Sequence, residues 1–154
     1  MPVRTFVPST KVQKKPNIPH YDPIPKTLGA HIRKKRIEGK LSQAHAAIAL
    51  GVDENTVTGW ELERNHPLIK YYPAIIAFLG YYPFDHETDT YAGKLKQIRY
   101  CKGLSFERCA VLLSISTDAA MRWERGKPIA NKMYKERIHS VWNGLPNHLL
   151  QHPA

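Results

Sequence analysis

One nineteen-residue stretch constrains the fold of this chain more than any other part of it. It runs from Gln43 to Glu61 and reads QAHAAIALGVDENTVTGWE. A small residue, Ala47, stands where two short helices would approach each other most closely, and Gly51 follows where a turn with positive φ suits glycine. Asp53 is placed to cap the second helix by accepting a hydrogen bond from a free backbone N–H group. The stretch therefore predicts two short helices that cross at a steep angle.

The residues around this stretch predict two further helices. Thr27 is a suitable cap for a helix over Leu28–Glu38, and Pro73 suits the first turn of a fourth helix, which ends before Gly80. Leu41 is expected to enter the core. The predicted pair itself covers Gln43–Leu50 and Glu54–Glu63, and the apolar seam that it shares consists of Ala46, Leu50, Val52, Val57 and Trp60.

The pattern recurs 63 residues further along the chain. Arg36 corresponds to Arg99, and Trp60-Glu61 corresponds to Trp123-Glu124. The repeat therefore consists of matching residues at a constant offset and not of a similar overall composition. We interpret both tryptophans as core residues and expect both glutamates to make contacts within their own unit. Further helices are expected near Thr90–Lys102, Phe106–Leu113, Asp118–Arg125 and Ala130–Trp142.

The fold class that follows is all-α, with two tandem units. We divide the chain into a flexible basic N-terminal arm (1–26), a first unit (27–84), a second, divergent unit (88–143) and a C-terminal tail (144–154). The second unit has Phe106 in place of Gln43, Ser114 in place of Gly51 and Ala120 in place of Val57. Serine in the turn implies some conformational cost.

The charge of the chain indicates an anionic partner, of which nucleic acid is the commonest. The formal net charge is +10 and the pI is about 9.7. Residues 1–26 contribute +4, residues 27–87 contribute 0 and residues 88–154 contribute +6. The arm also holds six of the twelve prolines, so we expect it to be either a solvated tail or a basic segment that follows phosphates or enters a minor groove.

Several kinds of function find no support in the sequence. No apolar run is long enough for a membrane span, and the histidines lack the neighbours that catalysis or metal binding would need. We interpret Cys101 and Cys109 as small core residues. We therefore expect no catalytic residues, no metal ligands, no cofactor and no enzyme activity.

The stretch resembles the lambda-repressor-like (Cro/XRE) helix-turn-helix family. The likeness lies in Ser42-Gln43, Gly51-Val52 and Trp60-Glu61, and in the segment WERGKP from Trp123 to Pro128. The resemblance implies a prokaryotic or phage transcription regulator that binds specific double-stranded DNA in the cytoplasm, associated with the nucleoid. Members of the family are often dimers, so a homodimer is a further expectation.

In this family the second helix of the pair enters the major groove. Mapped onto this chain, the residues facing bases are Glu54, Asn55, Thr58 and Gly59 in the first unit and Thr117, Asp118, Met121 and Arg122 in the second. The Asn55 amide suits adenine, and the Glu54 carboxylate can accept from the cytosine amino group. The Thr58 methyl group can contact thymine, and the Arg122 guanidinium suits guanine. Gly59 has no side chain, which either lets the helix approach the DNA closely or means that the base at that position is read weakly. The residues expected on phosphates are Gln43, Arg64 and Lys127.

Two alternative functions and one structural question remain open. The chain could be a DNA-binding accessory protein of recombination or transposition. It could also be an antitoxin-like protein whose second unit, through residues 88–142, binds a protein partner rather than DNA. Separately, the aromatic cluster from Tyr71 to Phe84 could pack within the chain or form the contact of a homodimer.

Overall fold

The computed structural model describes residues 21–85 and 87–147. Within them the chain forms eight α-helices and one short 3₁₀ helix, with no strand. The predictions for residues 1–20 of the arm and residues 148–154 of the tail lie outside this range. Nowhere in the described part is a helix both long and apolar enough to cross a membrane.

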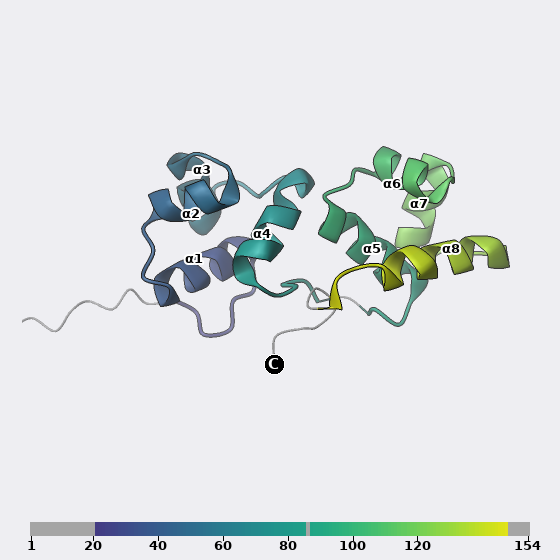
Figure 1. The fold of residues 1–154 in the computed structure, drawn as a ribbon, viewed down its shortest axis with the longest axis horizontal. Coiled ribbons are helices and arrows are strands. Elements are labelled where there is room, and N and C mark those ends of the chain that lie inside the picture. Colours follow the sequence, from purple (N-terminus) through teal and green to yellow (C-terminus); the bar gives the residue numbers. More distant parts are fainter. Residues whose placement is uncertain (1–20, 86, 148–154) are drawn as a thin grey trace, which may run out of the picture.

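The helices fall into two sets of four (Figure 1). The first set is α1 (Leu28–Glu38), α2 (Gln43–Leu50), α3 (Glu54–Glu61) and α4 (Tyr72–Leu79), with the 3₁₀ helix η1 (Ile69–Tyr71) before α4. The second set is α5 (Tyr91–Lys102), α6 (Phe106–Leu113), α7 (Thr117–Glu124) and α8 (Lys132–Asn143). We call these sets the first and the second unit.

Local capping explains where these helices begin. The side-chain oxygen of the residue before each of the first three helices of each unit accepts a hydrogen bond from a backbone N–H group of the first turn. The six caps are Thr27, Ser42, Asp53, Thr90, Ser105 and Ser116. The predicted bounds of α1, α2 and α6 are confirmed. The prediction for α3 was two residues too long, because Glu63 has a φ of 58° and cannot continue the helix.

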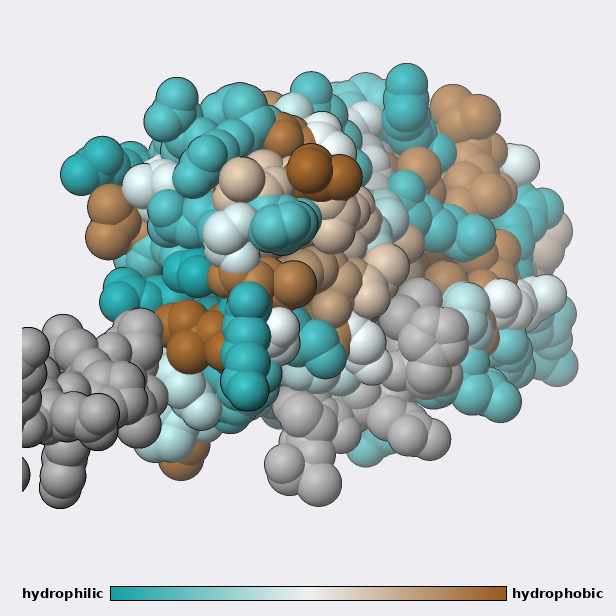
Figure 2. All heavy atoms as spheres, turned by 60° about the vertical axis from the view of Figure 1, so that its left-hand side comes forward, coloured by the Kyte–Doolittle hydropathy of each residue, from teal (hydrophilic) through white to brown (hydrophobic). Residues whose placement is uncertain are grey.

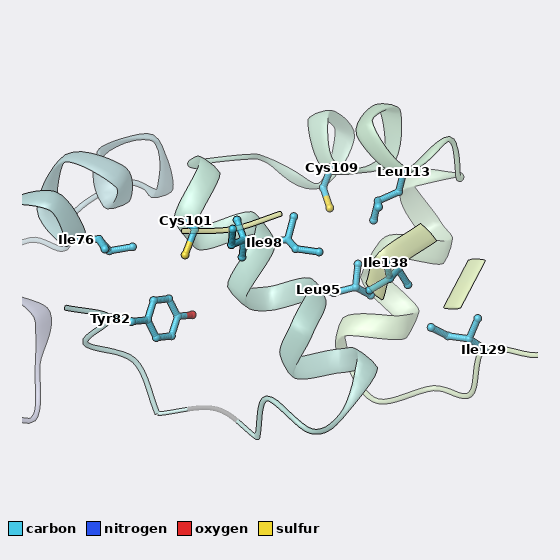
Figure 3. Packing of buried hydrophobic residues seen from close by; sticks show 10 residues of the cluster. Ile76, Tyr82, Leu95, Ile98, Cys101, Cys109, Leu113, Ile129 and Ile138 are labelled. Atoms are coloured by element: carbon cyan, nitrogen blue, oxygen red, sulfur yellow. The ribbon is translucent and has the colours of Figure 1, made fainter. Parts of the chain in front are cut away.

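Two hydrophobic cores hold the helices together, and α4 belongs to both. The first core joins α1 to α4 and contains Trp60 and Ile75. The second joins α5 to α8, but it also contains Ile76 from α4 and Tyr82 from the linker (Figure 3). Adjacent residues of one helix therefore point into different cores, and the two units are packed against each other.

The aromatic cluster packs within the chain, around the junction of the units. Phe84 lies 5.0 Å from Tyr72 and 4.7 Å from Tyr100, measured between ring centroids. Tyr82 is almost fully buried and its ring lies 5.2 Å from that of Phe84. These rings thus join α4, the linker and α5, which is the first of the two arrangements expected from the sequence.

Other expectations about the core have mixed outcomes. Trp60, Cys101 and Cys109 are buried, as predicted, and burial raises the pKa of each thiol to about 11. Trp123 is only half-buried and packs against Tyr134 at 5.4 Å. The prediction for Leu41 was wrong: 37% of it is exposed, because it lies in the loop between α1 and α2 rather than on a helix face.

Candidate nucleic-acid interface

The helix pair α2–α3 is built around the turn at Gly51. Gly51 has φ 68° and ψ 35°, a left-handed conformation, and its N–H group donates to the end of α2. Ala47 is buried and belongs to the core that α2 shares with α3. In the pair α6–α7, Ser114 holds the same conformation with φ 52° and ψ 51°. An L-residue is strained there, which agrees with the cost expected from the sequence.

An ion pair between partly buried Arg36 and buried Glu61 fixes α3 against α1. The Nε and Nη2 atoms of Arg36 donate to the two carboxylate oxygens of Glu61 at 2.6 and 2.7 Å. Its Nη1 atom donates to the backbone carbonyl of Leu41 at 3.0 Å. Hydrogen bonding to Glu61 raises the pKa of the Arg36 guanidinium, against the effect of burial. We call this arrangement the arginine–glutamate clamp.

The second unit repeats the clamp at the equivalent positions. Arg99 donates to both carboxylate oxygens of Glu124 at 2.7 and 2.8 Å, and to the carbonyl of Leu104 at 3.2 Å. Burial works against the charge of Arg99, but the hydrogen bonds and charge of Glu124 outweigh it and raise the pKa of the guanidinium. The clamps show that Glu61 and Glu124 make contacts within their own units, as predicted.

The two units cover the clamp in different ways. In the first, the Gln43 amide donates to Glu61 at 3.0 Å and its oxygen accepts from the Thr58 hydroxyl at 3.0 Å. In the second, the ring of Phe106 lies 4.0 Å from the Arg99 guanidinium carbon, a cation–π contact. Gln43 is therefore engaged on both sides of its amide, which restricts it as a phosphate ligand.

The first turn of α3 presents polar side chains outward. Glu54 and Asn55 are exposed and Thr58 is half-buried. Gly59, expected beside them, is instead buried, and a β-carbon there would come within 2.8 Å of the Asn65 amide oxygen. Asn65 therefore covers the position at which Gly59 was expected to face bases, and supplies the polar group found there.

The equivalent turn of α7 carries an exposed ion pair. Arg122 lies 3.7 Å from Asp118, and their side chains are 63% and 77% exposed. Thr117 and Met121 are half-buried. An exposed pair of this kind contributes little to stability, so the guanidinium of Arg122 remains available to another partner.

Arg64 and Lys127 occupy equivalent positions just after α3 and α7. The backbone N–H of Arg64 donates to Gly59 at 2.9 Å, and that of Lys127 donates to Arg122 at 3.1 Å. Both side chains are exposed. The two residues predicted to contact phosphates therefore lie just beyond the C-terminal ends of α3 and α7, next to Gly59 and Arg122.

The surfaces of the two pairs differ in charge. Helix α2 carries no charged side chain, and α3 has exposed Glu54. Helix α6 exposes Glu107 and Arg108, and α7 with its following loop exposes Asp118, Arg122, Arg125 and Lys127. In Figure 2, which brings the first unit forward, the upper edge is mostly hydrophilic with separate hydrophobic residues among the polar ones. The second pair is thus the more basic of the two.

Sequence reasoning did not identify the clamp or the position of Asn65. The clamp had a signal, because Arg36 and Glu61 have the same separation as Arg99 and Glu124. Asn65 had none, because its contact with Gly59 depends on the path of the loop. No group of three or more His, Cys, Asp or Glu within residues 21–85 and 87–147 is placed to hold a metal ion.

Comparison of the chain with protein-family models, with curated proteins and with solved structures finds no match.

Proposed function

We propose that this chain is a sequence-specific, double-stranded DNA-binding transcription regulator made of two tandem lambda-repressor-like helix-turn-helix units. Each unit would insert the first turn of its second pair helix, α3 or α7, into a major groove. A place in the cytoplasm, at the nucleoid, belongs to the same proposal. Such a protein needs no catalytic residue and no cofactor.

The observation that carries the proposal is the exposed polar first turn of α3 on an otherwise buried helix. Asn55 is exposed, whereas Val57 and Trp60 of the same helix are buried. The N-terminal turn of a reading helix is the part that reaches base edges, and an asparagine amide suits the N6 and N7 atoms of adenine.

Charge and register add support. Arg64 and Lys127 are exposed at equivalent positions after α3 and α7, where cations would meet phosphates. The chain carries a formal net charge of +10, which favours attraction to a duplex. Arg122 would exchange its exposed partner Asp118 for the O6 and N7 atoms of guanine.

The test begins with selection of binding sites from random duplex DNA by the full chain. Asn55→Ala is then compared with Asn143→Ala, which removes the same amide from an exposed position at the end of α8. We expect Asn55→Ala to weaken binding to the selected site by about 5- to 150-fold, the value of one bidentate base contact. We expect Asn143→Ala to have no effect.

Arg122→Ala tests the second unit in the same assay. It should relax the preference at one base pair and leave the free energy of unfolding nearly unchanged, because its ion pair is exposed. Absence of any enriched sequence would refute the proposal. An equal loss of affinity for all DNA in Asn55→Ala would make that residue a backbone contact instead.

One observation favours a second candidate function, in which the second unit binds a protein partner. Val111 on α6 is 80% exposed and Leu112 beside it is 42% exposed, whereas the equivalent helix α2 exposes one large apolar residue, Ile48. Adjacent exposed apolar residues favour an interaction surface. Binding of a protein partner through α6 would survive high salt, whereas affinity for DNA would fall steeply with salt concentration. Val111→Lys would abolish binding of the protein partner and leave binding of DNA intact.

A further inference from the structure

The two units meet through unlike surfaces. Helix α4 of the first unit packs on α5 of the second, although the equivalent of α4 in the repeat is α8 and the equivalent of α5 is α1. A two-fold arrangement would bring the same surface of each unit together. The contact here is head-to-tail instead.

Figure 1 shows the consequence for the reading helices. The pairs α2–α3 and α6–α7 both lie along the upper edge, with α1 and α5 below them. The last helix of each unit, α4 or α8, lies lower than its pair and extends further to the right. The second unit therefore repeats the orientation of the first along the chain, without the reversal that a two-fold axis would introduce.

The contact between the units is also a packed one. Ile76 of α4 lies in the second core, and the ring of Phe84 in the linker contacts rings from both α4 and α5. Gly103, at the end of α5, approaches Pro73 of α4 so closely that a β-carbon there would lie 3.0 Å from the proline ring. Buried, interlocked side chains of this kind resist relative movement of the units.

We propose that one chain recognises one composite DNA site, made of two unlike segments without dyad symmetry and held at a single spacing. The inference rests on the proposed function and adds the form of its ligand. The segments are unlike because α3 presents Glu54 and Asn55 where α7 presents Thr117 and Asp118. They lack dyad symmetry because the units are related head-to-tail, whereas a two-fold dimer reads a palindrome.

The fixed spacing comes from packing and not from the length of the linker. Residues 80–90 join α4 to α5, and eleven extended residues would span roughly 36–40 Å. One turn of DNA is about 34 Å. If the units were not packed together, the linker would therefore let the second unit reach a DNA segment moved away by one turn. Because the units are packed together, the second unit cannot reach that segment.

The experiment uses the full chain and the site selected from random duplex DNA. Insertions of 1, 5 and 10 base pairs are placed between the two protected segments, and affinity is measured for each duplex. We expect a loss of about tenfold or more for all three insertions, because the second unit loses its base contacts, each worth roughly 5- to 150-fold. A flexible chain would recover its affinity at 10 base pairs, where the segment returns to the same face of the duplex.

Variants at the junction separate packing from other causes. Phe84→Ala and the milder Phe84→Leu should reduce the loss caused by the 10-base-pair insertion. Phe78→Ala is the matched control, because Phe78 packs against the first core alone. Phe78→Ala should leave unchanged the ratio of the affinity for the selected site to the affinity for the site with 10 inserted base pairs. Circular dichroism at the assay temperature verifies that each variant is folded.

The outcomes distinguish this inference from the proposed function. A palindromic site, a site with one segment only, or full affinity at 10 inserted base pairs would each overturn the inference and leave the proposed function standing. If this affinity ratio is the same in the Phe84 and Phe78 variants, packing at the junction does not fix the spacing. No enriched sequence at all would instead refute the proposed function. A composite, asymmetric site that tolerates no insertion is the expected result.

Discussion

The left-handed turn between the two helices of each pair gives a prediction whose sign and size follow from the backbone. Ser114 and Gly51 occupy equivalent turns with φ 52° and 68°. A left-handed L-residue is strained by about 1–2 kcal/mol, while glycine loses roughly 0.5–1 kcal/mol more entropy on folding. Ser114→Gly should therefore raise the free energy of unfolding by about 0.5–1 kcal/mol.

The reverse change, Gly51→Ser, should lower it by a similar amount. No atom lies within 4 Å of where a β-carbon at Gly51 would stand, so the cost is that of the backbone alone. Ser114→Ala is the control, because it removes the hydroxyl and keeps the strained backbone. Urea unfolding followed by circular dichroism measures all three. The reasoning fails if Ser114→Ala stabilises as much as Ser114→Gly, or if Ser114→Gly does not stabilise.

Three further predictions concern the clamp, a thiol and a histidine. Glu61→Ala should lower the free energy of unfolding by about 1–3 kcal/mol, because it leaves the partly buried Arg36 guanidinium without its carboxylate partner. Glu54→Ala, on an exposed side chain, should change it by less than about 0.5 kcal/mol. Equal effects of the two changes in urea unfolding would contradict this. Cys109, whose pKa burial raises to about 11, should react with a thiol reagent at pH 8 much more slowly in the folded chain than in urea, and equal rates would count against its burial. Burial, together with a nearby lysine, lowers the pKa of His31 below 6.5, so the unfolded chain takes up that proton first and the free energy of unfolding should fall as pH drops below about 6.5. His31→Gln should flatten that part of the stability curve, and an unchanged slope would refute this reasoning.

The positions of the helices could be predicted because their signals are local. Thr27 and Asp53 cap helices through hydrogen bonds to residues three positions away. Pro73 lies in the first turn of α4, and Gly80 ends that helix with φ 81°. Each of these effects depends on neighbouring backbone groups, so the sequence alone reveals it.

The packing between the units could not be predicted in the same way. Ile75 and Ile76 are adjacent and equally apolar, and nothing in the sequence assigns them to different cores. Leu41 is apolar as well, yet the loop that holds it leaves it partly exposed. Such differences depend on which helices meet, which is a property of the tertiary structure rather than of any local pattern.

The side chain that covers the clamp differs between the two units, and the difference affects the surface beside it. Phe106 covers Arg99 with an aromatic ring, whereas Gln43 joins Glu61 to Thr58 through its amide. The second unit keeps the same ion-pair geometry without any such amide, so the fold does not depend on the polar version. In the first unit the amide holds the Thr58 hydroxyl one turn from Asn55, and it orders the polar surface that we propose reads DNA. The second unit lacks that amide bridge and exposes more basic side chains, so its contribution to binding would be more electrostatic than that of the first.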